Sequence, residues 1–278
     1  MSTVKPDKYA VFGSPIKHSK SPIIHQLFAE QTGQNISYDA IEVSADDFIK
    51  SVNTFFAGGG KGLNCTVPLK GLAWKYAENK SEHAEYSKAV NTLILQDDGS
   101  VYGDNTDGIG LVRDLNNNQG ISPNGKRILI LGAGGASRGI LGPLLDQLPM
   151  SVFIVNRTVS KALELANQFA KKGMVSGCGY ADLYDKKFDL ILNATSASLS
   201  DQLPPLPEGI LGKQGVCYDL AYGNKPTAFV RWGFENKAEK SLDGLGMLVE
   251  QAAEAFYLWR GVRPDTGLVI RELKNRIQ

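Results

Sequence analysis

The stretch ILILGAGGASRG, residues 128–139, joins a short apolar run to a glycine-rich turn and then to a segment with helical spacing. A strand, a glycine turn and a helix in this order are typical of a βαβ unit that binds a dinucleotide. Gly132 permits the tight turn, and Gly134 lets the backbone approach a pyrophosphate. Ser137 replaces the usual third glycine, which indicates a slightly looser contact between helix and strand. A lone glycine turn can also be a simple strand–helix corner, so the flanking sequence has to decide.

The segments after this turn continue the alternation of strands and helices. Apolar runs at 151–157, 188–195 and 216–222 are separated by helical patterns such as SKALELANQFAKK, residues 160–172. Short apolar strands between amphipathic helices predict a parallel sheet with both faces covered. We therefore expect a Rossmann-type dinucleotide-binding domain over residues 108–245.

The first part of the chain predicts a different sheet. Its strand-like runs lie at residues 9–13, 36–43, 62–67 and 89–96, and its helices are expected from residue 22 and over 45–57. DDG at 97–99 is typical of a hairpin turn, so this sheet should be mixed. The late helix over 247–261 is expected to return to this domain, which would comprise residues 1–107 and 246–278. The expected fold class is therefore α/β with two domains.

Composition excludes several classes of protein. The 278 residues carry 30 Lys and Arg against 29 Asp and Glu, a formal charge of +1, so neither nucleic acid nor an anionic membrane is an expected partner. The N-terminus lacks the apolar core of a signal peptide, and no apolar run reaches membrane-spanning length. Three scattered cysteines argue against a disulfide framework and favour a reducing, cytoplasmic location. The cysteines and three histidines show no metal-ligand spacing, so no metal is expected.

The end of the second strand of the parallel sheet indicates which dinucleotide binds. An NAD site normally has Asp or Glu there for the ribose 2′-hydroxyl, whereas this chain has Asn156, Arg157 and Thr158. A guanidinium can form paired hydrogen bonds with a 2′-phosphate, which a carboxylate would repel. Lys161 lies four residues beyond Arg157, and Thr158 could cap the next helix. A solvated basic turn is the alternative, and NADP(H) is the favoured cofactor.

Polar residues at a strand end mark a candidate catalytic segment, GLNCTVPLK, residues 62–70. Strand alternation sends Asn64 and Thr66 to one face and Leu63, Cys65 and Val67 to the other. The proline after this run should end the strand and begin a helix.

Lys70 would then lie in the first turn of that helix, where the dipole disfavours a cation. A residue placed against local preference is more common at functional sites than elsewhere. AVNTL offers Asn91, and GDNTDGIG offers Asn105, Thr106 and Asp107 just before another helix. A lysine with a nearby aspartate suits proton transfer during hydride transfer to a carbonyl. Each residue alone could equally be a cap or a turn residue.

A second polar segment is FGSPIKHSKSPIIHQLF, residues 12–28. Ser21 is expected at the N-cap of a helix, with Pro22 at its first position. A helix N-terminus with added serine hydroxyls suits an anion, and Ser19 lies at the same place. Plain capping and an anion site both remain open on these residues alone. His18 is more typical of a structural hydrogen bond than of acid–base chemistry, and His25 of an ordinary helix residue.

The motifs SKSP, NCTVPLK, AVNT, GDNTDG, GAGGAS, NRT, NATS and DGLGMLVEQAA occur in the order found in shikimate dehydrogenases. From about residue 8 to 275 the chain resembles the NADP-dependent biosynthetic members of this family. The resemblance implies reversible reduction of 3-dehydroshikimate by NADPH, a step toward aromatic amino acids. It also implies a two-domain fold with the cofactor over the cleft between the domains.

Carried over residue by residue, the resemblance implies that Lys70 and Asp107 are the catalytic pair. It favours the anion site, with the substrate carboxylate bound by Ser19, Ser21 and Tyr222. The ring hydroxyls would be held by Asn64, Thr66, Asn91 and Gln251. The cofactor would be surrounded by Gly132, Ala133, Gly134, Gly135, Ala136, Asn156, Arg157, Thr158, Lys161, Thr195, Gly244 and Met247.

Two positions depart from the family pattern. The family often has glycine and methionine after NATS, where this chain has ASLS at 197–200, and Lys161 fills a position that is frequently arginine. A relative that oxidises quinate and shikimate with NAD as well is the nearest alternative, and a dinucleotide sensor without turnover is another. Arg157 argues against the first, and Lys70 with Asp107 against the second. The expected assembly is a monomer or homodimer.

Overall fold

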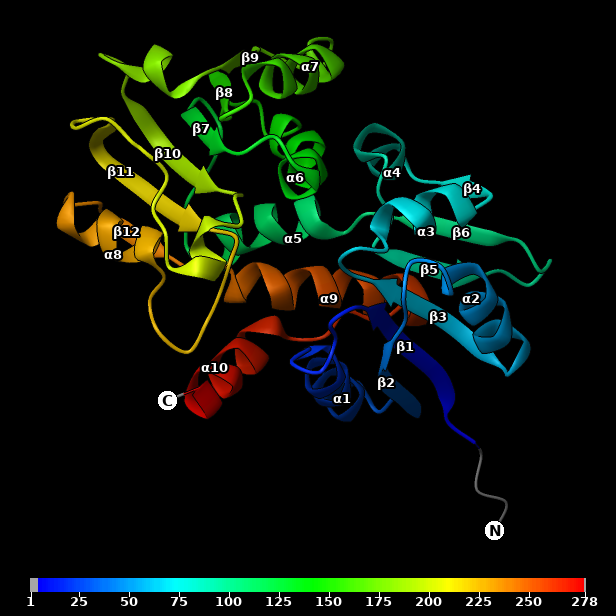
Figure 1. The fold of residues 1–278 in the computed structure, drawn as a ribbon. Helices are drawn as coiled ribbons and strands as arrows, with labels where there is room; N and C mark the ends of the chain where they lie inside the picture. The colour runs from blue at the N-terminus through cyan, green and yellow to red at the C-terminus, as the bar shows by residue number, and fades with distance from the viewer. Residues whose placement is uncertain (1–4, 278) are drawn as a thin grey trace. The chain divides into compact units, whose positions relative to one another are not determined.

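The structure is a computed structural model that describes residues 5–277. It divides into two compact units (Figure 1). Among the described residues, the first unit comprises 5–110 together with Val249–Arg276, and the second comprises Leu111–Leu248 with Ile277. The chain passes from one unit to the other within two helices, α5 (Asp107–Arg113) and α9 (Leu245–Arg260).

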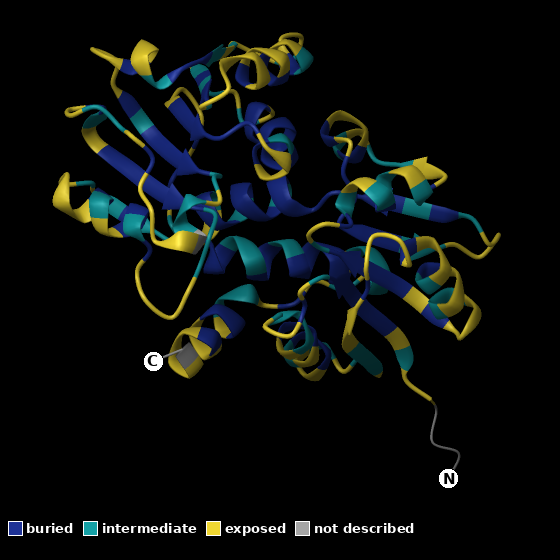
Figure 2. Ribbon diagram, in the orientation of Figure 1, coloured by how far each residue is buried: buried dark blue, intermediate teal, exposed yellow. Residues whose placement is uncertain are grey.

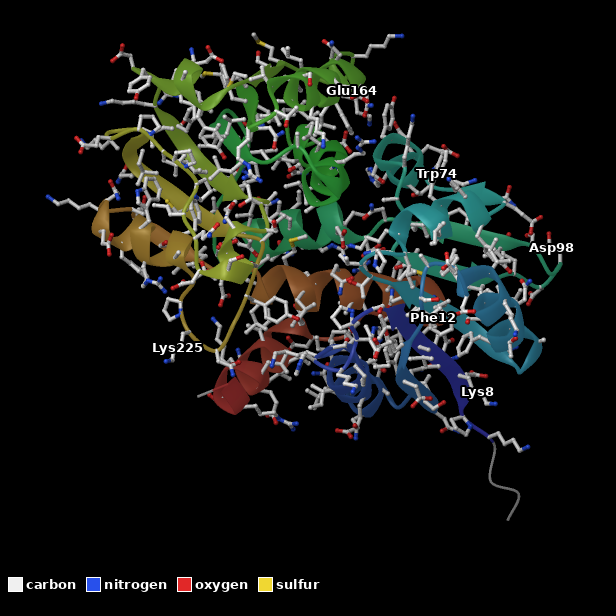
Figure 3. All side chains as sticks on the ribbon, in the orientation of Figure 1. Lys8, Phe12, Trp74, Asp98, Glu164 and Lys225 are labelled. Carbon is white, nitrogen blue, oxygen red and sulfur yellow. The ribbon has the colours of Figure 1, made fainter. Side chains whose placement is uncertain are left out.

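The first unit contains a mixed six-stranded sheet in the order β2-β1-β3-β5-β6-β4. Its strands are β1 (Asp7–Gly13), β2 (Ile36–Glu42), β3 (Gly60–Cys65), β4 (Asn79–Lys80), β5 (Thr92–Leu95) and β6 (Val101–Asp104). The pairs β3–β5 and β5–β6 are antiparallel, while the other pairs are parallel. The β5–β6 hairpin turns at Gly99, whose φ of +84° suits glycine, and Figure 3 shows Asp98 at its tip. The predicted mixed sheet and hairpin are confirmed.

The helices of this unit are α1 (Ser21–Thr32), α2 (Phe48–Ala57), α3 (Lys70–Tyr76), α4 (Glu82–Ser87), most of α9, and α10 (Thr266–Ile277). Leu63 and Cys65 lie in the apolar core with Phe12 and Phe48, as strand alternation predicts. The prediction for Val67 is wrong: this side chain is 69% exposed, because β3 ends at Cys65 and alternation stops there.

The second unit contains a parallel six-stranded sheet in the order β12-β11-β10-β7-β8-β9. Its elements are β7 (Arg127–Leu131), α6 (Gly135–Leu145), β8 (Ser151–Val155), α7 (Val159–Phe169), β9 (Val175–Cys178), β10 (Phe188–Asn193), β11 (Leu211–Asp219), α8 (Ala228–Glu235) and β12 (Lys240–Leu242). Alternate strand residues enter two separate apolar clusters, one with Ile130 and the other with Leu131. Both faces of the sheet are therefore covered, as predicted, and Figure 2 shows its strands largely buried.

Ser137 replaces the third glycine of the turn without loss of packing. Its side chain is fully buried, and its hydroxyl donates to the carbonyl oxygen of Gly132 at 2.7 Å. The serine therefore closes the turn with a side-chain hydrogen bond.

Within residues 5–277, no helix has both the length and the apolar character needed to span a bilayer. Cys65, Cys178 and Cys217 are buried free thiols. No group of three or more His, Cys, Asp or Glu side chains in the described part of the chain could hold a metal ion.

Candidate active site

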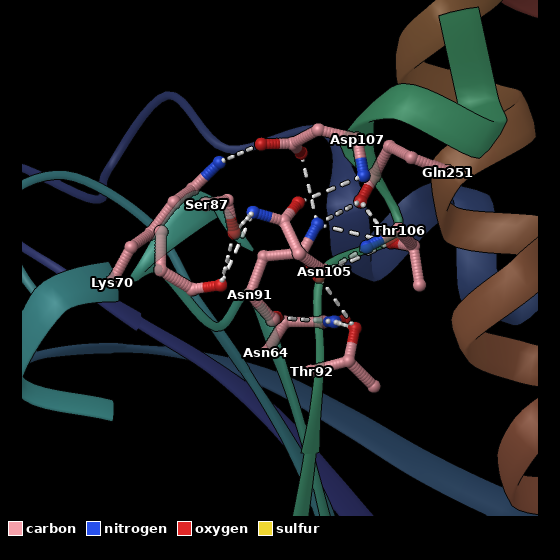
Figure 4. A network of polar contacts seen from close by, with 10 residues as sticks. Asn64, Lys70, Ser87, Asn91, Thr92, Asn105, Thr106, Asp107 and Gln251 are labelled. Atoms are coloured by element: carbon pink, nitrogen blue, oxygen red, sulfur yellow. Dashed lines mark hydrogen bonds and ion pairs between the residues drawn. The ribbon is translucent and has the colours of Figure 1, made fainter. Parts of the chain in front are cut away.

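Lys70 and Asp107 form an ion pair at the starts of two helices. Lys70 is the first residue of α3, two positions later than the start expected at Pro68, and Asp107 is the first residue of α5. The Lys70 Nζ lies 2.5 Å from Oδ2 of Asp107 (Figure 4). The lysine side chain is 29% exposed and that of the aspartate 12% exposed. The ammonium thus has a fixed counter-charge while part of it remains accessible.

Asn91 holds the other oxygen of the same carboxylate. Its Nδ2 donates to Oδ1 of Asp107 at 2.8 Å and to Oγ1 of Thr106 at 3.0 Å. Its Oδ1 accepts from the Thr106 backbone N–H and from the Thr92 hydroxyl, both at 2.9 Å. Since the asparagine is fixed on both sides, it orients the carboxylate toward Lys70.

Two further amides complete this network. Asn105 is fully buried, donates to Ser87 Oγ at 3.0 Å, and accepts the Asp107 backbone N–H at 3.2 Å. The Gln251 Oε1 lies 3.4 Å from Nδ2 of Asn91. A Cβ atom on Gly110 would lie 2.7 Å from Cβ of Gln251, so glycine allows α5 and α9 to approach closely there. The structure therefore brings Gln251 to Asn91 from a distant part of the sequence.

Asn64 lies on the side of β3 that faces this network. Its Nδ2 donates to the Asn91 carbonyl oxygen at 2.9 Å and to Thr92 Oγ1 at 3.0 Å. Its Oδ1 accepts from the Tyr38 hydroxyl at 2.7 Å. Thr66 is half-buried just beyond the end of β3. Sequence reasoning missed Tyr38 and Thr92 because ordinary strand residues give no signal of such contacts.

The structure corrects the predicted start of α1. The N-cap residue is Lys20, so Ser21 is the first helical residue and Pro22 the second. The Ser19 Oγ accepts the Ser21 backbone N–H at 3.3 Å. Ser21 was expected to cap the helix, but it is the first residue of the helix itself, and the N-cap residue Lys20 makes no side-chain cap.

His25 is not the ordinary helix residue that the sequence indicated. It is fully buried, and its ring stacks on Tyr38 with centroids 4.1 Å apart and planes at 7°. Burial lowers the pKa of His25 to about 3, with the Asn64 side chain opposing the shift. His18, in contrast, is exposed. His25 is therefore a neutral member of an aromatic cluster.

In the second unit, the glycine turn leaves open space in front of α6. Gly132 has φ of +99°, and its N–H donates to the Val155 carbonyl oxygen at 2.8 Å. Gly134 is the N-cap residue of α6 and makes no side-chain cap. A Cβ atom at Gly134 or Gly135 would meet no atom within 4 Å. The space beside these two glycines is therefore open, and an uncapped helix N-terminus suits an anionic group.

The basic segment after β8 is at the surface. Arg157, Thr158 and Lys161 are exposed, and Asn156 donates to the Thr158 carbonyl oxygen at 2.9 Å. Thr158 is the N-cap residue of α7, but the predicted capping bond is absent. Its hydroxyl is therefore not committed to capping that helix.

The remaining predicted residues of this unit lie in loops after strands or at a helix start. The Thr195 hydroxyl donates to Oδ1 of Asn193 at 2.7 Å. A Cβ atom on Gly244 would lie 2.2 Å from the Leu220 carbonyl oxygen, so this position excludes any side chain. The Met247 N–H donates to the Tyr218 hydroxyl at 3.3 Å. Tyr222 is half-buried, and burial raises its pKa. Ala133 and Ala136 belong to the glycine turn and to the first turn of α6.

Three family models match successive parts of the chain. The model of the shikimate dehydrogenase substrate binding domain matches residues 11–93, that of shikimate / quinate 5-dehydrogenase matches 115–200, and that of the shikimate 5'-dehydrogenase C-terminal domain matches 244–274. A relative from Methylococcus capsulatus, named shikimate dehydrogenase (NADP(+)), is 60% identical over 270 residues, covering 97% of each chain. The chain belongs to the shikimate dehydrogenase family.

Solved structures of shikimate dehydrogenases have the same fold. The enzyme from Aquifex aeolicus matches with a TM-score of 0.86 and 33% identity, covering 99% of this chain and 100% of that one. The Thermus thermophilus enzyme, solved in complex with NADP(H) and shikimate, matches with a TM-score of 0.85 and 31% identity, covering 98% and 100%. The similarity therefore extends over both units.

The segment Ala197–Ser200, where the sequence departs from the usual shikimate dehydrogenase pattern, forms a 3₁₀ turn. The Ser198 hydroxyl donates to Oδ2 of Asp219 at 2.5 Å. Asp219 is fully buried and also accepts from the Thr227 hydroxyl at 2.6 Å. The serine thus connects the segment after β10 to the last residue of β11, a contact the sequence did not reveal.

Proposed function

We propose that this protein reduces 3-dehydroshikimate to shikimate with NADPH and catalyses the reverse oxidation with NADP⁺. The proposal is supported by membership of the shikimate dehydrogenase family and by relatives named as NADP(+) enzymes. The observation that carries the mechanism is the Lys70–Asp107 pair, 2.5 Å apart and held by Asn91.

Bound NADPH supplies a hydride to the carbonyl carbon. As the carbonyl oxygen gains negative charge, the Lys70 ammonium donates a proton to it, so that a hydroxyl forms and no free alkoxide is released. The lysine, now neutral, regains a proton from solvent through its accessible face. The Asp107 carboxylate stabilises the ammonium and keeps it in position. In the oxidation, neutral Lys70 takes the proton from the hydroxyl as the hydride leaves.

The other polar residues of the first unit would bind the substrate. Ser19 and Ser21 would bind the carboxylate at the start of α1. The ring hydroxyls would form hydrogen bonds with the side-chain amides of Asn64, Asn91 and Gln251 and with the hydroxyl of Thr66. The carboxylate is remote from the reacting carbon, and its contacts together with those to the ring hydroxyls would fix the ring for hydride transfer.

The second unit has the features that a dinucleotide phosphate needs. Gly132, Gly134 and Gly135 leave the uncapped N-terminus of α6 open to a pyrophosphate, flanked by Ala133 and Ala136. The 2′-phosphate would contact Arg157, supported by Asn156, Thr158 and Lys161. Thr195 and Gly244 would also contact the cofactor, and Met247 would border the nicotinamide. We accordingly assign NADP binding to residues 108–245 and substrate binding to residues 1–107 with 246–278.

An assay of both directions tests the proposal. NADPH consumption is followed with 3-dehydroshikimate, and shikimate and quinate oxidation are followed with NADP⁺ and NAD⁺. We expect turnover of shikimate with a strong preference for NADP⁺. Comparable rates with quinate and NAD⁺ would identify a quinate/shikimate dehydrogenase, while cofactor binding without turnover would identify a sensor. Gel filtration would show whether the enzyme is a monomer or a homodimer, and its buried free thiols suit a reducing compartment such as the cytoplasm.

A further inference from the structure

We propose that Tyr38 is a positioning residue of the substrate pocket, which fixes the side chain of Asn64 through its hydroxyl group. This inference rests on the proposed function, since it concerns how the same pocket holds its substrate. Tyr38 lies on β2, outside every motif that the sequence analysis singled out.

The Tyr38 hydroxyl contacts a residue assigned to substrate binding. It donates to Oδ1 of Asn64 at 2.7 Å. Asn64 is assigned to the ring hydroxyls of the substrate and lies on β3, whereas Tyr38 lies on β2. The phenol thus holds, from a different strand, an amide that would bind the ring.

The polarity of the bonds around Asn64 allows only one orientation of its amide. The Thr92 hydroxyl donates its hydrogen to Oδ1 of Asn91, so its oxygen accepts from Nδ2 of Asn64. The second Nδ2 hydrogen is donated to the Asn91 carbonyl oxygen. A flipped amide would place its oxygen against this carbonyl and its NH₂ against the phenol hydrogen. Tyr38 therefore secures the orientation in which Oδ1 is the acceptor.

The same polarity continues to the catalytic pair. Tyr38 donates to Asn64, Asn64 to Thr92, Thr92 to Asn91, and Asn91 to Asp107. Each hydrogen bond in this series is donated in the direction of Asp107. A change at Tyr38 is therefore expected to act first on Asn64. It should act only weakly on Asp107, because Lys70 and Asn105 also hydrogen-bond to that residue.

Aromatic packing fixes the Tyr38 ring independently of its hydroxyl. The ring stacks on His25 at 4.1 Å and lies 6.3 Å from Trp259. Burial raises the pKa of Tyr38 well above its ordinary value, so the hydroxyl stays a donor throughout the working pH range. Phenylalanine would keep the packing and remove only the hydroxyl, which makes Tyr38→Phe a clean test.

The experiment compares steady-state kinetics of wild-type enzyme, Tyr38→Phe and Tyr76→Phe. In the control, the Tyr76 hydroxyl also donates to an asparagine Oδ1 at 2.7 Å, that of Asn53, but at the exposed surface of the same unit and outside the site. We expect Tyr38→Phe to raise KM for shikimate about five- to twentyfold, with a smaller fall in kcat and KM for NADP⁺ within about twofold of wild type. Tyr76→Phe should leave all three constants near wild type.

A purely structural role would lower the fraction of folded enzyme, and so kcat, while leaving KM unchanged. A double variant with Asn64→Ala tests the route: if Tyr38 acts through Asn64, the second change adds little to the loss in KM. An unchanged KM for shikimate in Tyr38→Phe, or fully multiplicative losses in the double variant, would overturn the inference. Absence of shikimate turnover in the wild-type enzyme would instead overturn the proposed function.

Discussion

The ammonium of Lys70 lies 2.5 Å from the carboxylate of Asp107, although the two residues are 37 positions apart and begin different helices. A cation in the first turn of α3 meets the positive end of the helix dipole, so the position is unfavourable for the helix alone. The carboxylate offsets this cost. The same contact gives the proposed proton donor a fixed partner.

Replacing either residue of this pair should remove most of the catalytic rate. A positioned acid contributes roughly a hundredfold to ten-thousandfold, about 3–5 kcal/mol. We expect losses of this order in kcat for Lys70→Ala, and a substantial loss for Asp107→Asn because an amide carries no counter-charge. If the two act as one unit, the double variant should be little worse than the poorer single one, whereas fully multiplicative losses would show that they work independently. Stopped-flow and steady-state rates measure this directly.

Circular dichroism and NADP⁺ titration of each variant separate lost chemistry from lost fold. The affinity for NADP⁺ should remain near wild type, since the residues assigned to the cofactor lie in the second unit. A near-normal kcat in Lys70→Ala would remove the lysine from the mechanism.

The choice of cofactor should depend on Arg157. Arg157→Asp removes a charge-assisted contact with the 2′-phosphate and adds repulsion, so KM for NADP⁺ should rise roughly tenfold to a hundredfold while KM for NAD⁺ does not rise. Lys171→Asp, which makes the same change of charge at another exposed position of this unit, should leave both values near wild type. An equal loss for both cofactors in Arg157→Asp would show that the turn is structural.

Asp219 should be important for stability. Its carboxylate is fully buried and accepts from the Ser198 and Thr227 hydroxyls and the Asn193 amide. Asp219→Asn would replace one of the two acceptor oxygens with an NH₂ group, which faces these donors and cannot accept from them. We expect the free energy of unfolding to fall by ~2–4 kcal/mol. Urea denaturation measures this change. The exposed ion pair of Asp201 with Arg231 provides the control, since Asp201→Asn should cost less than about 1 kcal/mol. Equal effects of the two substitutions would contradict this role.

Buried His25 should make the protein less stable in mild acid. Its pKa is about 3 in the folded state and near 6.5 when unfolded, so the unfolded state binds the extra proton as the pH falls below 6.5. Between pH 7 and pH 5 this should remove about 2 kcal/mol from the free energy of unfolding. The loss should end near pH 3, where the folded state also binds the proton.

Denaturant unfolding at several pH values tests the His25 prediction against two variants. His25→Phe keeps an aromatic ring in the cluster and should show a shallower decline toward pH 5 than wild type. His18→Gln changes an exposed histidine and should decline as wild type does. Parallel curves for wild type and His25→Phe would contradict the prediction.

Local chemistry allowed much of the fold to be predicted from the sequence. The glycine turn at 132–135, the hairpin at 97–99 and the apolar strand runs each depend on neighbouring residues alone. Errors occurred where an element ends: Val67 lies beyond the last residue of β3, and Ser21 follows the true N-cap, Lys20. Whether one residue belongs to an element depends on contacts that local pattern does not contain.

The sequence by itself determined which local elements form and which polar residues they carry, including a lysine at the start of a helix, where a cation is unfavourable. Only the tertiary structure decided which side chains meet. Tyr38 reaches Asn64 from 26 positions away, and Gln251 reaches Asn91 from 160. These contacts follow from strand order in the mixed sheet and from the return of α9, which close long loops. Such closure depends on the packing of the whole unit, so no short window of sequence records it.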